Sequence, residues 1–469
     1  MNSIRQVVES GSCVGCGACS VATAGAVPLT LTPYKAYVAE LEGLTDDVLS
    51  DASAVCPFAD ESPDEDAVAE TVLPQTLAHD GRIGRYLGTY AGRILDEIDI
   101  TSSSSGGLTT WILGQLLERG LVDGVIHVGS GDDQLFEYKV SRSIDELVAR
   151  RKSQYFPVNF VGALDEIKGD GKRYAFVGIP CAIKAMRHLM NQDAELGEQM
   201  TFLVGIVCGH LKSMAYAESF AWQLGIAPDQ IGTVDFRVKD PERTSREYGF
   251  RAVSRDGRVN EAKTLSLLGG SWGHAVFQLG ACDFCDDIFA ETADVVLGDA
   301  WLARYEVEWQ GTNAVVTRNA DIDGILRAGR ASGAIMLDDL SVDSVAATQG
   351  GNFRHRRDGL AIRLHDDLEA GLWTPRKRVQ PDANAVSEER RGLIRKRRDL
   401  SRISHQLFLK AREVNSLQVY MDGMTPLIGE YQQGTKMTFG TRLRNKAKRE
   451  SWKIVHRAQA RMSRRRGRL

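Results

Sequence analysis

Apolar and polar positions along the chain follow two spacings, and together they predict a mixed fold of strands and helices. Residues 173–178 and 200–207 contain short continuous apolar runs, which are typical of buried strands. Each run leads into a turn that holds one cysteine, and a helical pattern follows. After the polar loop TSSSSGG, apolar side chains recur near one helical face at Leu108, Ile112, Leu116 and Leu117. This alternation predicts an α/β (α+β) fold class.

Shorter patterns extend the prediction along the chain. Further strands are predicted at residues 120–129, 293–299 and 311–319. Asp256-Gly257 separates two polar, strand-like runs and predicts a hairpin, while residues 36–44 predict a short hairpin strand with a turn. The acidic residues 58–81, with prolines nearby, predict a linker. Residues 387–421 predict one long helix.

The eight cysteines divide into two sets of four, and the first set lies close to the N-terminus. Its members form a C-x-x-C-x-x-C motif and a distant Cys-Pro pair: Cys13, Cys16, Cys19 and Cys56. Proline after the last cysteine is typical of ferredoxins, and four thiolates hold one 4Fe–4S cluster. Glycine and alanine between the cysteines let backbone amides point at the sulfurs. The alternative is a zinc site, because C-x-x-C pairs also build zinc ribbons.

The second set of cysteines is spread over the middle of the chain. Cys181 and Cys208 each follow a predicted strand, at the position where open α/β sheets collect ligands. Cys282 and Cys285 form a C-x-x-C motif that has no other partner. These four predict a second 4Fe–4S cluster. The alternative for a lone cysteine in such a turn is a buried apolar residue.

Composition and charge narrow the class of protein only slightly. The net charge is -4, and the 469 residues suggest about three domains at roughly 150 residues each. No signal peptide and no run of about 20 apolar residues is visible, so we expect a cytoplasmic protein with redox or metal-binding cysteines rather than disulfides. The charge is uneven, with acidic residues at 46–70 and basic residues at 436–468.

The basic tail suggests contact with something anionic. Its apolar positions from Phe439 to Met462 step along one helical face, as in helices that lie on anionic membranes. The alternatives are a partner protein or a solvated tail. Nucleic acid is disfavoured because aromatic residues do not alternate with the basic ones along the tail.

The order of several motifs resembles the family of coenzyme F420 hydrogenase/dehydrogenase beta subunits, which includes reductases of the hydroxymethyl chlorophyll a type. The matching segments, over roughly residues 10 to 320, are the N-terminal cysteine motif, SSGGLTTWILGQLLERGLVDGV, RKSQYFPV, FVGIPCAIKAMRHL, VGIVCGH, ACDFC and ADVVLGDAW. The Ser/Gly loop before residue 108 also offers amides and hydroxyls to a phosphate, although serine-rich helix caps are common.

The resemblance implies two 4Fe–4S clusters, bound FAD and electron exchange with ferredoxin or with the deazaflavin coenzyme F420. By the same resemblance the flavin contacts are Ser104, Ser105, Gly106, Gly107, Ser153, Tyr155, Pro180 and Asp299. Gln154 stands where family members more often carry a basic residue. His210 and Lys184 are candidate proton donors by position alone, and the alternatives are a packed histidine and a solvated lysine.

These observations together predict an organisation and a function. The predicted parts are a ferredoxin-like 4Fe–4S module at 1–65, the two halves of a flavin-binding reductase core at 80–165 and 166–340, and a basic helical extension at 341–469. The predicted function is an iron–sulfur flavoprotein oxidoreductase that relays electrons between an external carrier and a small substrate. The alternative is a non-catalytic electron-transfer subunit that supplies a partner dehydrogenase or hydrogenase. The sequence does not identify the substrate.

Overall fold

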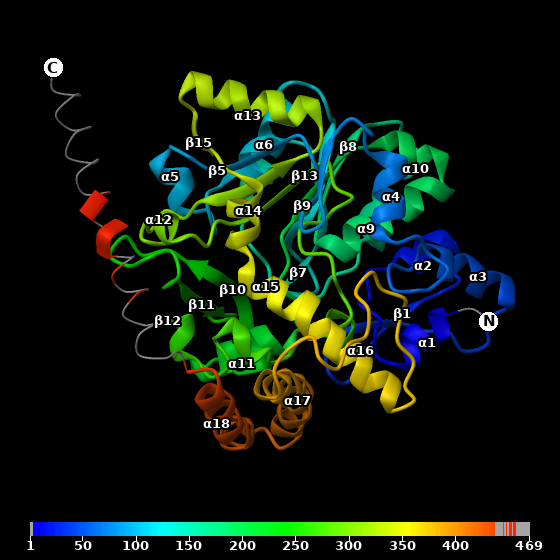
Figure 1. The fold of residues 1–469 in the computed structure, drawn as a ribbon, viewed down its shortest axis with the longest axis vertical. Helices are drawn as coiled ribbons and strands as arrows, with labels where there is room; N and C mark the ends of the chain where they lie inside the picture. The colour runs from blue at the N-terminus through cyan, green and yellow to red at the C-terminus, as the bar shows by residue number, and fades with distance from the viewer. Residues whose placement is uncertain (1–2, 437–443, 445–446, 448–449, 453, 456–469) are drawn as a thin grey trace.

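An eight-stranded mixed sheet lies at the centre of the structure, a computed structural model that describes residues 3–436, 444, 447, 450–452 and 454–455 (Figure 1). In spatial order its strands are β15 (Ile335–Asp339), β5 (Gly88–Ile94), β14 (Asn313–Thr317), β13 (Val295–Asp299), β9 (Met200–Ile206), β8 (Tyr174–Gly178), β6 (Gly124–Ser130) and β7 (Phe136–Ser141). The sheet therefore combines strands from both predicted halves of the reductase core. The predicted α/β (α+β) class is confirmed.

Strand direction decides which loops meet at one edge of this sheet. Strands β6, β8, β9 and β13 run parallel to one another. Strand β14 is antiparallel to both β13 and β5, so β5 points the same way as the four parallel strands. The carboxyl ends of these five strands consequently lie at the same edge, which is where α/β sheets bind ligands.

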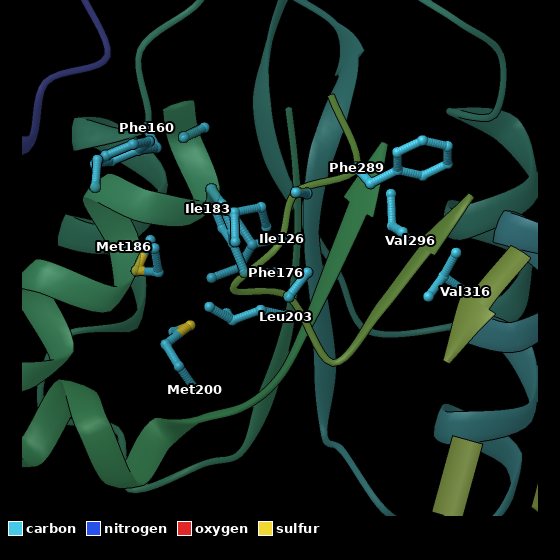
Figure 2. Close-up of a cluster of buried hydrophobic side chains, with 14 of the residues drawn as sticks. Ile126, Phe160, Phe176, Ile183, Met186, Met200, Leu203, Phe289, Val296 and Val316 are labelled. Atoms are coloured by element: carbon cyan, nitrogen blue, oxygen red, sulfur yellow. The ribbon is translucent and has the colours of Figure 1, made fainter. Parts of the chain in front are cut away.

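Helices cover both faces of the sheet, because neighbouring residues on each buried strand point to opposite sides. Ala175 and Val204 pack toward one face. Phe176 and Leu203 pack toward the other face, in the cluster that Figure 2 shows. The first face is covered by α5 (Glu97–Thr101), α6 (Leu108–Glu118), α7 (Ile144–Ala149) and α13 (Ala320–Ser332). The second is covered by α8 (Val161–Ile167), α9 (Pro180–Gln192), α10 (Ala194–Gln199) and α14 (Val342–Thr348).

The N-terminal segment packs against α9 on the second face (Figure 1). It contains α1 (Ile4–Glu9), α2 (Ala18–Ala22), the hairpin of β1 (Leu29–Leu31) and β2 (Tyr37–Ala39), and α3 (Asp46–Val55). The predicted linker at 58–81 is wrong in part, because α4 (Glu65–Val72) forms there and contacts α9. Asp64 starts this helix by accepting a hydrogen bond from the Ala67 amide, a capping signal that the acidic composition concealed. The hairpin of β3 (Ala78–Asp80) and β4 (Gly84–Tyr86) follows.

A second, smaller layer lies below the carboxyl edge of the sheet (Figure 1). It contains α11 (Ala215–Gln223) and the antiparallel strands β10 (Ile231–Val238), β11 (Gly249–Ser254) and β12 (Val259–Lys263). The predicted hairpin at Asp256-Gly257 joins β11 and β12 and is confirmed. Helices α17 (Glu388–Glu413) and α18 (Leu417–Gly434) pack against α11.

The single long helix predicted at 387–421 is wrong, because the chain turns back between α17 and α18. Asn415 adopts a φ of 49° at the turn, a conformation that asparagine tolerates better than most residues. The turn brings Phe408 and Tyr420 together against Phe277. Burial of this aromatic cluster therefore overrides the local helical pattern.

The remaining helical elements connect these layers. The segment from α15 (Gly350–Phe353) through a π-helical turn (Arg354–Asp358) to α16 (Gly359–Glu369) runs from the sheet toward the N-terminal segment (Figure 1). Short helical turns occur at Pro228–Gln230, Thr264–Ser266, Trp272–His274, Ala303–Glu306 (α12) and Gly280–Asp283. None of the described helices combines the length with the apolar character that a membrane-spanning helix needs. The predicted amphipathic face from Phe439 to Met462 lies mostly outside the described residues and stays a prediction.

Candidate cofactor-binding site

A cavity of about 290 Å³ opens at the carboxyl edge of the sheet. It is lined by Cys16 of the first cysteine set and by Cys181 and Cys208 of the second. Of the predicted flavin contacts, Ser104, Ser105, Gly107, Ser153, Tyr155 and Asp299 line it. Segments that are distant in the sequence meet here because strands β5, β8, β9 and β13 end at the same edge of the sheet.

Two predicted contacts, Gly106 and Pro180, are not among the lining residues. A side chain at Gly106 would place its Cβ 2.6 Å from the backbone oxygen of Gly92 on β5. Glycine at this position therefore allows the loop to approach the sheet closely. Pro180 is the first residue of α9, where its fixed φ and missing amide hydrogen suit a helix start.

Hydrogen bonds fix the Ser/Gly loop at the N-terminus of α6. Gly107 caps the helix with a φ of 76°, and the next amide, that of Leu108, donates to Asn313 Oδ1 on β14. Ser104 Oγ accepts a hydrogen bond of 2.8 Å from the Ser153 amide, which joins two of the predicted flavin motifs. The amine of the half-buried Lys239 donates to the carbonyl of Ser105 at 2.7 Å. The loop is thus held in place before any ligand binds.

An ion pair closes one side of the cavity. The guanidinium of Arg237 donates to both carboxylate oxygens of Asp299, at 2.8 and 3.2 Å, and lies over the ring of Tyr248. Burial alone would lower the pKa of Arg237, but Asp299 beside it raises that pKa above its usual value. Arg237 and Lys239 were missed in the sequence, because a basic residue late in a polar strand carries no local signal of function.

Several polar atoms in the wall of this cavity are buried and have no hydrogen-bond partner among the residues that the structure describes. They are Gln154 Oε1, His210 Nε2 and Arg237 Nε. Buried polar groups are nearly always satisfied, and an unpaired one costs about 1–3 kcal/mol. These atoms fit a polar ligand that supplies both donors and acceptors, as the rim of a flavin ring does.

The first cysteine set lines a small cavity of about 20 Å³, which α2 borders with Ala18 and Cys19. All four members line it: Cys13, Cys16, Cys19 and Cys56. Burial raises the pKa of Cys16 to about 12 and that of Cys56 to about 12, with smaller contributions from neighbouring thiols. Four such thiols become thiolates together only beside a strong positive charge, so the set suits a metal cluster.

Glycine conformation shapes the binding loop of the first set. Gly15 has a φ of 64°, and a Cβ there would lie 2.4 Å from Cβ of Tyr37. Its amide donates to Cys13 Sγ at 3.4 Å. Amides directed at sulfur stabilise the negative charge of a cluster.

The fold also brings the second cysteine set together. Burial raises the pKa of Cys208 to about 11 and of Cys282 to about 12, and electrostatic interactions link these two thiols to each other, to Cys181 and to Cys285. The Leu211 amide donates to Cys282 Sγ at 3.1 Å. Arg356 donates to Cys285 Sγ and to the carbonyl of Gly209. This set therefore has both an amide and a cation directed at it.

The two kinds of metal centre that four thiolates could hold differ in size. Among the described residues, no three His, Cys, Asp or Glu side chains form a group that could hold a single metal ion. A zinc ion binds its thiolates at about 2.3 Å, whereas a cubane cluster separates them by its own width. Tyr138 lies near both sets: burial raises its pKa, and the neighbouring thiols Cys181 and Cys16 raise that pKa further.

Comparison with known proteins places this architecture in a family. Residues 89–165 match the family model described as coenzyme F420 hydrogenase/dehydrogenase, beta subunit N-term, and residues 171–343 match the corresponding C-terminus model. The chain belongs to the family of coenzyme F420 hydrogenase/dehydrogenase beta subunits. The cavity lies within these two matched regions, apart from Cys16 and Val14.

Individual relatives of this family are distant. The chain is 24% identical over 317 residues to the coenzyme F420-dependent sulfite reductase of Methanocaldococcus jannaschii, covering 63% of this chain and 43% of that protein. It is 24% identical over 252 residues to the beta subunit of the coenzyme F420 hydrogenase of Methanothermobacter thermautotrophicus, covering 52% of this chain and 82% of that protein. The chain thus spans less than half of the sulfite reductase.

A likeness to solved structures is also found, at low identity. A chain of the F420-reducing NiFe hydrogenase complex from Methanosarcina barkeri aligns with a TM-score of 0.48 and 16% identity, covering 64% of this chain and 99% of that chain.

The two candidate proton donors of this family member lie in different surroundings. His210 lines the cavity and stacks on Trp272, with ring centroids 4.3 Å apart. Burial, together with the nearby cations Lys212 and Arg397, lowers the pKa of His210 well below its usual value, so its imidazole is neutral. Lys184 lies on α9 near Glu65, at 3.4 Å, and is not a lining residue. The alternative of a solvated Lys184 is wrong, because the side chain is buried.

Proposed function

We propose that this chain is an iron–sulfur flavoprotein oxidoreductase with two 4Fe–4S clusters and one FAD. It exchanges electrons with an external carrier, either ferredoxin or the deazaflavin coenzyme F420, and reduces or oxidises a small substrate. The proposal is supported by relatives whose names describe F420-linked reductases and dehydrogenase subunits. Clusters transfer single electrons and a flavin transfers pairs, which together connect a one-electron carrier to a two-electron substrate.

One observation carries the proposal: a single cavity is lined by cysteines of both sets and by the Ser/Gly loop. Electron transfer between redox groups requires short separations, and this cavity is the place in the described structure that borders both sets. The cavity is small for a whole FAD at about 290 Å³, but it adjoins a second cavity of about 1030 Å³ with which it shares Tyr155 and Trp272.

The residues of the cavity divide into an anion-binding side and a ring-binding side. The Ser/Gly loop presents hydroxyls and amides, which suit the phosphates of a dinucleotide. Arg151 and Lys152 also line this side, each in an ion pair of 2.6 Å, with Asp99 and Asp235 respectively. Tyr155 and Trp272 present aromatic faces with ring centroids 4.9 Å apart. His210, neutral and unpaired at Nε2, is placed to hold or move a proton beside the bound ring.

Anaerobic purification followed by iron, sulfide and flavin analysis tests the proposal. We expect equal iron and sulfide and one flavin per chain. Cys16→Ser and Cys282→Ser should each remove about half of the iron, because each disrupts one set of four ligands. Cys16→Ser should also abolish turnover driven by the carrier while flavin stays bound. Ser20→Ala, beside Cys19 on α2, is the matched control and should keep all the iron. A colourless protein that contains zinc would contradict the proposal.

A second candidate is a non-catalytic subunit that supplies electrons to a partner dehydrogenase or hydrogenase. It is favoured by the names of the relatives, several of which are single subunits of larger enzymes. Turnover by the purified chain alone, with ferredoxin or coenzyme F420, would support the enzyme. Co-purification of a stoichiometric redox partner together with an inactive isolated chain would support the subunit.

A further inference from the structure

A short segment of the C-terminal extension, the strap at residues 373–378, lies close to both cysteine sets. It follows α16, is outside the family-matched regions and passes beside the N-terminal segment before α17 begins (Figure 1). The amide of Arg376 donates to Asp60 Oδ1 at 2.7 Å, and Asp60 closely follows Cys56 of the first set. The extension is therefore anchored on the segment that carries the first set.

Trp373, at the start of the strap, packs against an apolar cluster that both cysteine sets border. The buried members of this cluster are Val7, Val14, Phe58, Ala59 and Ala281. Five cysteines pack against the same cluster: Cys13, Cys16 and Cys56 of the first set, and Cys181 and Cys285 of the second. Trp373 thus completes an apolar layer that the two sets share, although it comes from a distant part of the chain.

The basic residues of the strap pair with buried carboxylates beside the second set. Lys377 Nζ lies 2.9 Å from Asp286 Oδ1, and the two side chains are 6% and 0% exposed. Nη1 of Arg378 lies 2.7 Å from Glu291 Oε2 and 2.9 Å from Asp66 Oδ1 on α4. Arg378 consequently joins α4, which follows the first set along the chain, to the loop that follows the second set.

Asp286 depends on the strap for compensation of its charge. Within the described structure, the cations at ion-pair distance from this carboxylate are Lys377 and Arg378, the latter at 3.4 Å. A buried carboxylate without a partner is unfavourable, and loss of one partner of a buried pair is strongly destabilising. The strap therefore stabilises the loop that begins with Cys285.

We propose that the strap positions the two cysteine sets relative to each other, and thereby the clusters that they bind. Lys377 and Arg378 are positioning residues that hold the loop of the second set against α4, while Trp373 excludes water from the shared apolar layer. Solvent exposure and nearby charge set the potential of a cluster, so both effects act on electron transfer. The inference rests on the proposed function for the identity of the bound groups, but the contacts of the strap themselves require no metal.

Hydrogen exchange of the anaerobically purified full chain, followed by mass spectrometry, tests the positioning role. Arg378→Gln should raise the exchange rates of amides in α4 and in residues 283–291 by about tenfold, because the ion pairs that join them are lost. Arg378→Lys should restore part of the protection, since it keeps the charge but not the paired hydrogen bonds. Arg402→Gln is the matched control, because it disrupts an exposed pair with Asp399 away from the strap.

Lys377→Gln keeps this test valid if Arg378→Gln misfolds. Lys377 pairs with Asp286 but makes no ion pair with α4 among the described contacts. Its replacement should therefore raise exchange in residues 283–291 more than in α4. Wild-type exchange in both regions of Arg378→Gln, or in residues 283–291 of Lys377→Gln, would overturn the positioning role.

The rate at which a chelator removes iron tests the exclusion of water. Trp373→Ala should lose iron about fivefold faster than the wild type, because solvent then reaches the layer between the sets. Trp373→Phe, which keeps an aromatic ring, should give an intermediate rate and serves if the alanine variant misfolds. Leu372→Ala is the matched control, since Leu372 is the neighbouring residue and is 57% exposed. A wild-type rate in both variants of Trp373 would overturn this role.

Iron and sulfide are measured on the same samples, which separates the two proposals. A chain without clusters whose strap variants still exchange faster than the wild type refutes only the proposed function. A fully loaded chain whose strap variants exchange hydrogen and lose iron like the wild type refutes only this inference.

Discussion

A single buried arginine outside the family-matched regions contacts the second cysteine set. Arg356 is 1% exposed and donates to Cys285 Sγ, to the carbonyl of Asp287 at 2.6 Å and to the carbonyl of Gly209 at 3.0 Å. Burial would lower its pKa, but the neighbouring thiols raise that pKa above the usual value. A permanent positive charge therefore lies beside one of the proposed cluster ligands.

Replacing this charge should change the potential of the second cluster. Positive charge and hydrogen bonds to sulfur favour the reduced cluster, so Arg356→Gln should lower the midpoint potential by about 60 mV, equivalent to a tenfold change for one electron. A redox titration followed by electron paramagnetic resonance measures this potential. Arg357→Gln is the control, because Arg357 faces Glu291 instead of a cysteine. An unchanged or raised potential in Arg356→Gln would show that Arg356 is only structural.

At the scale of elements, the antiparallel pair of α17 and α18 is held by an aromatic cluster. Tyr420 is fully buried and stacks on Phe277 with ring centroids 5.5 Å apart. It also meets the edge of Phe408 at 5.6 Å. Its hydroxyl is buried without a partner among the described residues. The ring therefore stabilises the pair, whereas the hydroxyl opposes it.

Two substitutions at Tyr420 separate these contributions. Tyr420→Phe removes the unpaired hydroxyl and should leave the free energy of unfolding unchanged or raise it by about 1 kcal/mol. Tyr420→Ala opens a cavity and should lower it by about 3–5 kcal/mol. Chemical denaturation followed by circular dichroism measures both values. Marked destabilisation by Tyr420→Phe would mean that the hydroxyl has a bonding partner after all.

At the scale of the whole molecule, buried histidines make stability depend on pH. Burial lowers the pKa of His127, His188, His274 and His405 to about 4 in each case. The unfolded chain has histidine pKa values of about 6.5, so it binds more protons than the folded chain between these two values. The contribution of these histidines to the free energy of unfolding is therefore fully present above about pH 6.5. It is lost as the pH falls toward 4.

One of these histidines gives a direct test. His188 lies on α9 with Nε2 unpaired, and its shift corresponds to at most about 3 kcal/mol at 1.36 kcal/mol per pKa unit. Measured melting temperatures should fall less between pH 6.5 and 5 for His188→Gln than for the wild type. His79→Gln, at an exposed position, should follow the wild type. An identical pH profile for His188→Gln and wild type would exclude His188 as a source of acid sensitivity.

Local pattern was sufficient for the strands and for most of the residues of the site. The apolar runs at 173–178 and 200–207 form β8 and β9, and their ends carry Cys181 and Cys208 into the cavity. The local pattern did not predict the elements whose bounds depend on long-range packing. The turn at Asn415 has no glycine or proline to mark it, and α4 lies in a segment whose composition suggested a linker.

The sequence by itself determined the grouping of the cysteines and the strand-turn-helix units, because both depend on residue type and short spacing. Only the tertiary structure decided that β5, β8, β9 and β13 end at one edge, and thereby that the Ser/Gly loop and both cysteine sets border one cavity. It also brought Arg237, Arg356 and Arg397 to that region from distant segments. Strand order and the packing of the extension arise from contacts between remote residues, which no local pattern encodes.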